Sequence, residues 1–228
     1  MNAAERLRLE SQLRGEVADA PEAEAAPMVT HGHAALAVYL DRIIEHPEHR
    51  QEITIEIMKT FGQECAVMIL DMSGFSRTTQ RYGIVSFLLM IHQTRLLVSP
   101  CVQGHRGRIV KAEADNLFCT FPSVMDAITA AREIEARLRA ANCILPVDRR
   151  LYVSCGIGFG HILNVGDQDF FGDEVNLASK LGEDVGKMGD ILLTPNAYAE
   201  VREETIPIKE GQVNVSGLSF PYYSVEDY

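Results

Sequence analysis

A continuous apolar run at residues 65–70 (CAVMIL) constrains the fold of this 228-residue chain more than any other segment. The run has the length of a β-strand, and an unbroken apolar stretch of that length is typical of a buried strand. It stops at Asp71. A buried strand that ends in a carboxylate predicts a functional group at the edge of a sheet, and Asp71 is the first candidate.

Strand and helix patterns alternate along the rest of the chain. Helical spacing predicts a long helix at residues 84–98, and two apolar runs joined by a tight turn near Asp115 and Asn116 predict a hairpin at residues 108–121. Further elements are expected at residues 124–141 (amphipathic helix), 151–159 (strand), 173–181 (helix), 191–193 (strand), 195–201 (short helix) and 222–225 (strand). This order predicts an α+β fold with a ferredoxin-like, split βαβ sheet and helices on one face.

Glycine recurs at the end of the strand predicted at residues 151–159, at Gly156, Gly158 and Gly160. The spacing is not that of a dinucleotide-binding loop, and no acidic partner follows at the expected distance. We interpret these glycines as positions where another backbone packs closely against the strand.

The first 60 residues differ in composition from the rest of the chain. Residues 1–27 are rich in Ala, Glu and Arg and poor in β-branched and aromatic side chains, which predicts a tail, or a helix that needs a partner. Helical spacing predicts a helix at residues 34–45, followed by a linker through Ile53 and Ile57. We therefore divide the chain into an N-terminal tail, helix and linker at residues 1–60 and a globular domain at residues 61–228.

The charge balance limits the partners of the chain. It has 21 Lys and Arg against 32 Asp and Glu, a formal net charge of -11, whereas a nucleic-acid partner needs a basic face. An acidic protein can still bind a metal–nucleotide complex, because the ion supplies the positive charge to which carboxylates bind. We expect a nucleotide partner and no nucleic acid.

Cysteine usage and hydropathy predict a compartment. The longest mostly apolar stretch, residues 85–91, is far shorter than the ~20 residues that span a bilayer, and the N-terminus has no apolar signal core. The cysteines are odd in number and widely spaced, which fits neither a disulfide framework nor a CxxC zinc site. They are interpreted as core thiols: Cys65, Cys101, Cys119, Cys143 and Cys155. A cytoplasmic protein without a membrane span is predicted.

Asp71 and Asp115 are expected at the ends of adjacent strands, where two carboxylates can hold divalent ions that also bind a triphosphate. The carbonyl of Met72 could join the metal shell. The pattern leaves an alternative open for each aspartate taken alone, because Asp71 could cap the helix that follows and Asp115 could start a turn.

Three residues after this strand are candidates for substrate binding: Ser73, Gly74 and Phe75. A glycine at this place lets backbone N–H groups approach phosphate oxygens closely. We predict that this segment contacts the phosphates of the nucleotide.

Three strings give the chain a family resemblance: DMSGFS at 71–76, GRIVKAEAD at 107–115 and DFFGDEVNLASK at 169–180. Their order and approximate spacing resemble those of class III nucleotidyl cyclases, from about residue 62 to residue 228. The resemblance implies a domain that dimerises head to tail and converts ATP into cyclic AMP and pyrophosphate. It also implies two Mg²⁺ or Mn²⁺ ions per site, with both sites at the subunit interface.

The resemblance assigns a role to each matching position. Asp71 and Asp115 look like the metal-binding aspartates, and Lys111 and Asp169 look like the pair that reads the purine. A lysine can donate to an adenine ring nitrogen while an aspartate accepts from the exocyclic amine, and guanine needs roughly the opposite pattern. Lys111 therefore favours ATP, and the alternative is a solvated lysine on a strand.

The resemblance continues at Asn176, which matches the asparagine that orients the ribose, and at Lys180, one turn later on the same helix face. Cyclases usually have Arg at the position of Lys180, and lysine lacks the planar fork that grips a phosphate. Other departures are Ser216 in place of a phosphate-binding lysine and the Glu113–Ala114 pair before Asp115. Loss of one preorganised donor typically lowers a rate by ~10²–10³, so these departures predict slower turnover.

The sequence thus predicts a homodimeric adenylate cyclase. Two alternatives remain open: a catalytically weak or silent nucleotide-binding and dimerisation module, and a cyclase with an altered base preference. The resemblance also implies an upstream regulator that acts through the N-terminal helix, because such domains commonly receive signals there.

Overall fold

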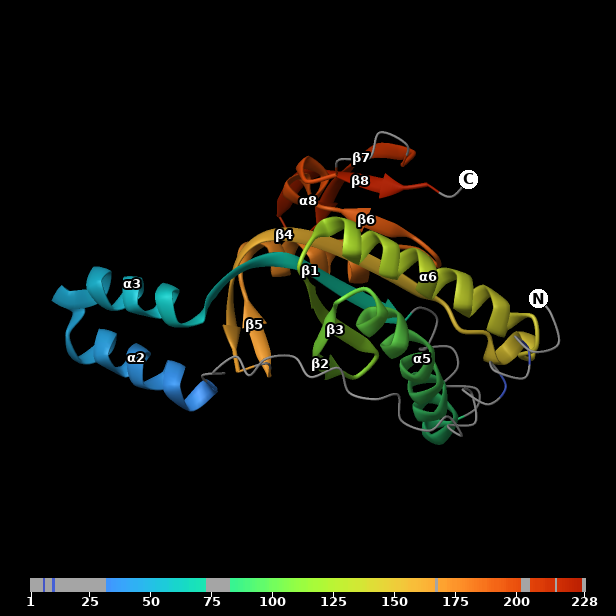
Figure 1. Ribbon diagram of the computed structural model, residues 1–228, viewed down its shortest axis with the longest axis horizontal. Helices are drawn as coiled ribbons and strands as arrows, with labels where there is room; N and C mark the ends of the chain where they lie inside the picture. The colour runs from blue at the N-terminus through green and yellow to red at the C-terminus, as the bar shows by residue number, and fades with distance from the viewer. Residues whose placement is uncertain are drawn as a thin grey trace.

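A helical hairpin precedes the sheet. The computed structural model describes residues 6, 10, 32–72, 83–166, 168–201, 206–215 and 217–226, and in it α2 (His33–Glu45) and α3 (Arg50–Phe61) flank the short η1 (Pro47–His49). The predicted first helix is confirmed, but the predicted linker is wrong because it is α3. Ile53, Ile57 and Phe61 recur every four residues, so one helix face buries them against Val165. Figure 1 shows the hairpin standing beside the sheet.

An antiparallel-rich sheet forms the body of the described structure. Its strand order is β2-β3-β1-β4-β6-β8-β7, with β5 beside β4, and β4 and β6 are the parallel pair. The strands are β1 (Gly62–Met72), β2 (Arg108–Glu113), β3 (Asn116–Phe121), β4 (Val153–Val165), β5 (Asp169–Phe171), β6 (Ile191–Leu193), β7 (Ile208–Val215) and β8 (Leu218–Val225). The long β1–β4 pair runs from the Gly62–Leu163 register to Met72–Val153 and forms the centre of the sheet. The predicted α+β class is confirmed.

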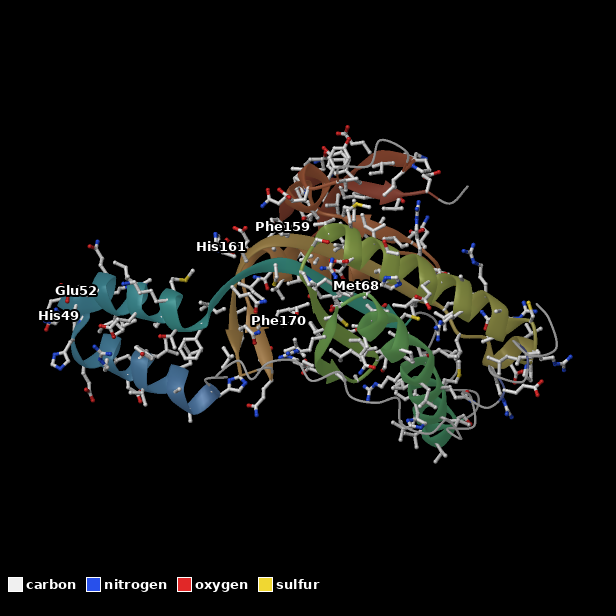
Figure 2. The ribbon with its side chains drawn as sticks, in the orientation of Figure 1. His49, Glu52, Met68, Phe159, His161 and Phe170 are labelled. Carbon is white, nitrogen blue, oxygen red and sulfur yellow. The ribbon has the colours of Figure 1, made fainter. Side chains whose placement is uncertain are left out.

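Helices cover both faces of this sheet. They are α5 (Ile84–Gly104), α6 (Val124–Asn142), η2 (Val147–Arg149), α7 (Asp173–Lys180), the π-helical turn η3 (Leu181–Val185) and α8 (Pro195–Ala199). Met68 of β1 lies in the core cluster of α5 and α6, whereas Val67 lies with Phe170 and Val175 in the cluster of α7; Met68 and Phe170 are labelled in Figure 2. The prediction of helices on one face is wrong, because a strand with apolar residues at every position needs cover on both sides.

Helix α5 is longer and more apolar than predicted. Among the described residues, it is the one helix long and apolar enough to cross a membrane by length and composition alone, with a mean hydropathy of 1.4 over its most apolar stretch. Its second half is packed in the core, where Leu97, Val98 and Cys101 are fully buried. Core packing therefore accounts for the apolar character of that half, and the expected absence of a membrane span stays a prediction.

Two strands and one thiol differ from the sequence prediction. β5 is too short to give an apolar pattern, and β7 (IKEGQVNV) is an edge strand with mostly polar residues, so neither was predicted. Four of the five cysteines are buried as expected, and burial raises the pKa of Cys65, Cys101 and Cys119 to about 12. Cys143 is exposed because it caps the C-terminus of α6, so its assignment to the core is wrong.

The glycines of β4 bring α7 against the sheet. A Cβ atom at Gly156 would overlap the carbonyl oxygen of Ala178, and one at Gly158 would come within 2.8 Å of the carbonyl oxygen of Glu174. The predicted close backbone packing is confirmed. The packing sets α7, and with it Asn176, at a fixed height above β4.

Candidate functional site

Asp71 lies in β1 between two neighbouring strands. It is opposite Asn116 of β3 on one side and Ser154 of β4 on the other. Its side chain is half-buried, and Met72, which follows it, has a buried side chain in the core. The backbone of Met72, rather than its side chain, is therefore the part available to a ligand.

Asp115 lies in the turn between β2 and β3, and this turn covers residues 114–115, one residue earlier than the turn predicted near Asp115 and Asn116. Ala114, before it, has a left-handed backbone with φ 49°, which a residue other than glycine rarely adopts. The Ala114 carbonyl accepts a hydrogen bond of 2.8 Å from Arg95 Nη2 of α5. This bond ties the strained turn to a core helix and so fixes the position of Asp115.

The structure brings the two predicted metal ligands together. The pKa of the Asp71 carboxyl is raised to about 6, first by burial and then by the negative charges of Asp115 and Glu183. Two carboxylates that are close enough to repel each other favour the binding of a cation between them. The alternative reading of Asp71 as a helix cap lies outside the described residues, because residues 73–82 follow it.

A third carboxylate, Glu183, approaches from η3. Asn116 Nδ2 donates a hydrogen bond of 3.1 Å to Glu183 Oε1. Burial raises the pKa of Glu183, as do the charges of Asp184 and Asp115, while Lys180 lowers it. Sequence reasoning missed Glu183, since it lies just after the helix predicted at residues 173–181 and nothing local relates it to Asp71, 112 residues earlier.

The donor set near Asp71 fits a divalent ion held by two carboxylates. Within the described ranges, no group of three His, Cys, Asp or Glu side chains is placed to hold a metal. Asn116 Oδ1, beside Asp115, is buried and has no hydrogen-bond partner among the described residues. An unmatched acceptor next to two oxygen ligands suits Mg²⁺ or Mn²⁺, which also keep water and substrate oxygens in their coordination shell.

Lys111 and Asp169 also lie together, although 58 positions separate them in the chain. Lys111 Nζ on β2 is 3.4 Å from Asp169 Oδ1 on β5, 2.9 Å from Glu113 Oε2 and 5.0 Å from the centre of the Phe118 ring. The pKa of Lys111 is raised, first by its hydrogen bond to Glu113 and then by the charge of Asp169, against the effect of burial. The predicted purine pair therefore exists as a contact within one chain.

Asn176 and Lys180 lie on α7, on a different element from both pairs. Asn176 is exposed, and Lys180 Nζ is 3.9 Å from Asp184 Oδ2. Within the part of the chain that the structure describes, neither makes a hydrogen bond or ion pair with Asp71 or Asp115. The structure thus forms two pairs and leaves the α7 residues apart from them.

Four of the residues discussed from sequence lie outside the described residues: Ser73, Gly74, Phe75 and Ser216. Their predicted contacts with phosphate stay predictions.

Solved structures of nucleotide cyclases share this fold. The structure described as adenylate/guanylate cyclase/hydrolase from Silicibacter pomeroyi has a TM-score of 0.63 at 26% identity and covers 73% of this chain and 98% of its own. The guanylyl cyclase Cya2 has a TM-score of 0.62 at 17% identity, over 72% of this chain and 92% of its own. The fold is that of a class III nucleotidyl cyclase domain.

Sequence comparison finds similarity to part of a longer protein. The Rhizobium meliloti (strain 1021) protein named "Putative adenylate cyclase 3" is 29% identical over 140 residues, which are 61% of this chain and 24% of that protein. The chain spans about a quarter of the length of this relative. No protein-family model matches the chain. Since the fold is shared with structures described as adenylate/guanylate and as guanylyl cyclases, the fold alone does not identify a substrate, which has to be argued from the candidate site itself.

Proposed function

We propose that this chain is an adenylate cyclase domain that converts ATP into 3',5'-cyclic AMP and pyrophosphate. The contact between Lys111 and Asp169, with Nζ and Oδ1 3.4 Å apart, carries the proposal. A lysine beside an aspartate matches adenine, because the ammonium donates to a ring nitrogen and the carboxylate accepts from the exocyclic amine. Guanine presents a carbonyl where adenine has its amine, and that carbonyl would face the Asp169 carboxylate unfavourably.

Asp71 and Asp115 are the residues that would hold two Mg²⁺ or Mn²⁺ ions, with the carbonyl of Met72 as a further ligand. When bound, the ions neutralise triphosphate charge and polarise the attacking and leaving oxygens. The contribution of the chain is to present two carboxylates at fixed places. The sheet register holds Asp71, and the Arg95 bond to the turn holds Asp115.

The proposed sites are shared between two copies of the chain. Among the described residues, no hydrogen bond or ion pair joins Asn176 or Lys180 to the metal aspartates of the same chain, and we infer that a second copy supplies the residues that orient the ribose and the phosphates. A head-to-tail dimer meets this need by placing α7 of one copy against Asp71 and Asp115 of the other. Each copy would then serve one site with its carboxylates and the other site with α7.

The first test is an assay of the purified protein with Mn²⁺ and each nucleoside triphosphate in turn. We expect cyclic AMP from ATP and little product from GTP, CTP or UTP. Asp71→Ala is the matched inactive control. If a protein confirmed as a dimer gives no cyclic nucleotide, the proposal is wrong, and if GTP is the preferred substrate, the reading of Lys111 is wrong.

The shared site is tested with mixed dimers. Asp71→Ala and Asn176→Ala chains are each expected to be inactive alone. Mixing them restores one complete site, with Asp71 from the Asn176→Ala chain and Asn176 from the Asp71→Ala chain. Failure to recover activity in a mixed dimer would contradict the sharing of sites.

A second candidate function is a nucleotide-binding and dimerisation module with little or no turnover. The observation that favours it is the charge around the site, where Glu183 adds a third carboxylate and Asp184 engages Lys180 at 3.9 Å. Both effects would weaken the grip on a triphosphate. This function predicts ATP binding, measured by calorimetry with Mn²⁺, without cyclic AMP, and activity that Asp71→Ala abolishes would rule it out.

We further propose that the chain divides near residue 60 into an N-terminal regulatory segment and the cyclase domain, and that it works in the cytoplasm. β1 begins at Gly62, directly after α3, so a signal that rotates the α2–α3 hairpin would act on the strand that carries Asp71. Deletion of residues 1–60 with full retention of basal activity would support the division.

A further inference from the structure

Glu174 is a buried carboxylate in the first turn of α7 and has no role in the site described so far. It is 7% exposed and accepts three hydrogen bonds. The Thr194 hydroxyl and the Phe159 backbone N–H donate to Oε2 at 2.6 and 3.1 Å, and Asn196 Nδ2 donates to Oε1 at 2.7 Å. An ionised carboxylate is purely an acceptor, so three donors match its needs. Figure 2 labels Phe159 on the central strand β4.

These three donors come from two other parts of the fold. Phe159 lies in β4, whereas Thr194 and Asn196 lie at the start of α8, where the Thr194 hydroxyl also accepts from the Ala197 backbone N–H. Glu174 therefore connects α7 to the sheet and to α8 at one point. A buried carboxylate that is fully hydrogen-bonded fixes its surroundings, because any displacement leaves a donor unpaired.

The glycines of β4 make room for this carboxylate. A Cβ at Gly158 would lie 2.9 Å from Glu174 Oε2, and one at Gly160 would lie 3.1 Å from Glu174 Cγ. Side chains at Gly158 and Gly160 would therefore crowd the Glu174 side chain out of this position.

Helix α7 depends on this anchor for its position. Its N-cap is Gly172, which offers no side chain to hold the first turn, and the helix is a short one that continues as the π-helical turn η3. Glu174 precedes Asn176 by two residues. A shift of the first turn would therefore carry Asn176 with it.

We propose that Glu174 is a positioning residue for Asn176: through its bonds to Phe159, Thr194 and Asn196 it sets where α7 presents that side chain to the nucleotide. This inference rests on the proposed function. Glu174 touches neither the substrate nor the ions and acts through the backbone of α7. Misplacement of a catalytic group by about 1 Å can lower a rate ~10²-fold, so a small shift of α7 is sufficient for a large effect.

The test begins with Glu174→Gln, which keeps the shape but places an amide donor against existing donors. We expect kcat to fall between roughly tenfold and a hundredfold. KM for ATP should change less than about threefold, because the residues proposed to bind the base, Lys111 and Asp169, lie on β2 and β5 and not on α7. Asp173→Asn is the matched control, since it removes an exposed charge from the preceding position of the same helix turn and should leave kcat unchanged.

A second variant guards against loss of folding. Asn196 is exposed, so Asn196→Ala removes one of the three hydrogen bonds without opening a buried cavity. We expect a smaller fall of kcat in the same direction, about twofold to fivefold. The midpoint of urea unfolding is measured for every variant, so that a loss of folded protein is distinguished from a loss of rate.

Mixed dimers separate positioning from general damage. When Glu174→Gln is in one chain and Asp71→Ala in the other, the remaining active site uses α7 of the Asp71→Ala chain, and we expect the full activity of one site. When both changes are in the same chain and the partner is wild type, the remaining site uses the altered α7, and we expect the reduced kcat.

The outcomes decide the inference. Equal activity of the two mixed dimers, or a wild-type kcat for Glu174→Gln, would overturn the positioning role while the adenylate cyclase proposal stands. A wild-type protein that makes no cyclic AMP would instead overturn the proposed function, and the positioning role with it.

Discussion

Replacing Asp71 with asparagine should stabilise the metal-free protein at alkaline pH. Burial, and then the charges of Asp115 and Glu183, raise the pKa of Asp71 from 3.8 to about 6. A carboxyl whose pKa is higher in the folded than in the unfolded chain favours folding while it is protonated, and that stabilisation is lost as the pH rises through about 6. Above pH 7 the ionised side chain therefore opposes folding, and asparagine removes that opposition.

The size of the effect follows from the pKa. At ~1.4 kcal/mol for each pH unit, a rise from 3.8 to about 6 corresponds to roughly 3 kcal/mol as an upper bound. Asp71 is half-buried, so solvent screens the neighbouring charges, and we expect Asp71→Asn to raise the free energy of unfolding by about 1–2 kcal/mol near pH 8. The gain should shrink toward zero as the pH approaches about 4, where the wild-type side chain is protonated.

Urea unfolding in the presence of EDTA, at about pH 8 and about pH 4.5, measures this gain. Asp148→Asn is the control, because Asp148 is an exposed carboxylate on η2 and its neutralisation should change stability little at either pH. Addition of Mn²⁺ should then stabilise the wild type more than Asp71→Asn. A variant that is no more stable than the wild type at pH 8, or equally stabilised at both pH values, would refute the reasoning.

Three further predictions follow from the same geometry. Lys111→Ala should lower kcat/KM for ATP by about 10–100-fold and that for GTP by less, because it removes a donor to the adenine ring, and steady-state assays with both substrates check this. Lys180→Arg should raise kcat by about 2–10-fold, since the planar guanidinium can grip a phosphate with two hydrogen bonds; an unchanged or lower kcat would indicate that Asp184 keeps the side chain away. Glu183→Gln should lower the pKa of Asp71 in the metal-free protein, because it removes one of the charges that raise it, and a carboxyl NMR titration in which that pKa stays constant would contradict the placement of Glu183.

The central strand and its carboxylate could be predicted from the sequence because their signal is local. An apolar run of strand length that stops at an aspartate predicts a buried strand from adjacent residues alone. The pairing of β1 with β3 and β4 adds the neighbours of that strand. The same run also required cover on both faces, since Val67 and Met68 point to opposite sides. The prediction of helices on one face came from the order of elements, which carries less information than the strand itself.

Segments with weak or mixed patterns are the ones that the sequence predicts wrongly or not at all. The sequence predicts a linker in place of α3 because charged residues hide the four-residue spacing of Ile53, Ile57 and Phe61. β7 pairs with β8 over its whole length, but as an edge strand it has little apolar character. In both segments tertiary contacts, rather than local preference, decide the structure.

The residues of the candidate site also divide into those that the local sequence predicts and those that depend on tertiary contacts. Asp71, Asp115, Lys111 and Asp169 could be named because they fall in strings that resemble a known family. Glu183 could not, because its approach to Asp71 depends on how α7 and η3 lie across the sheet. That placement depends on glycines in β4, and no pattern around Glu183 reports it.

Lys111 has two carboxylate neighbours in the structure, Glu113 and Asp169. In the sequence, Glu113 is a departure from the cyclase pattern. In the structure it competes with Asp169 for Lys111, since its carboxylate is 2.9 Å from Lys111 Nζ whereas that of Asp169 is 3.4 Å away. The Glu113 side chain is 66% exposed, so water screens this ion pair and little free energy opposes its exchange for a base nitrogen. Asp169 is less exposed, and its Oδ1 also accepts the Phe170 backbone N–H at 2.9 Å. Asp169 is therefore the preorganised member of the proposed purine pair, and Lys111 is the member that has to change partners when adenine binds.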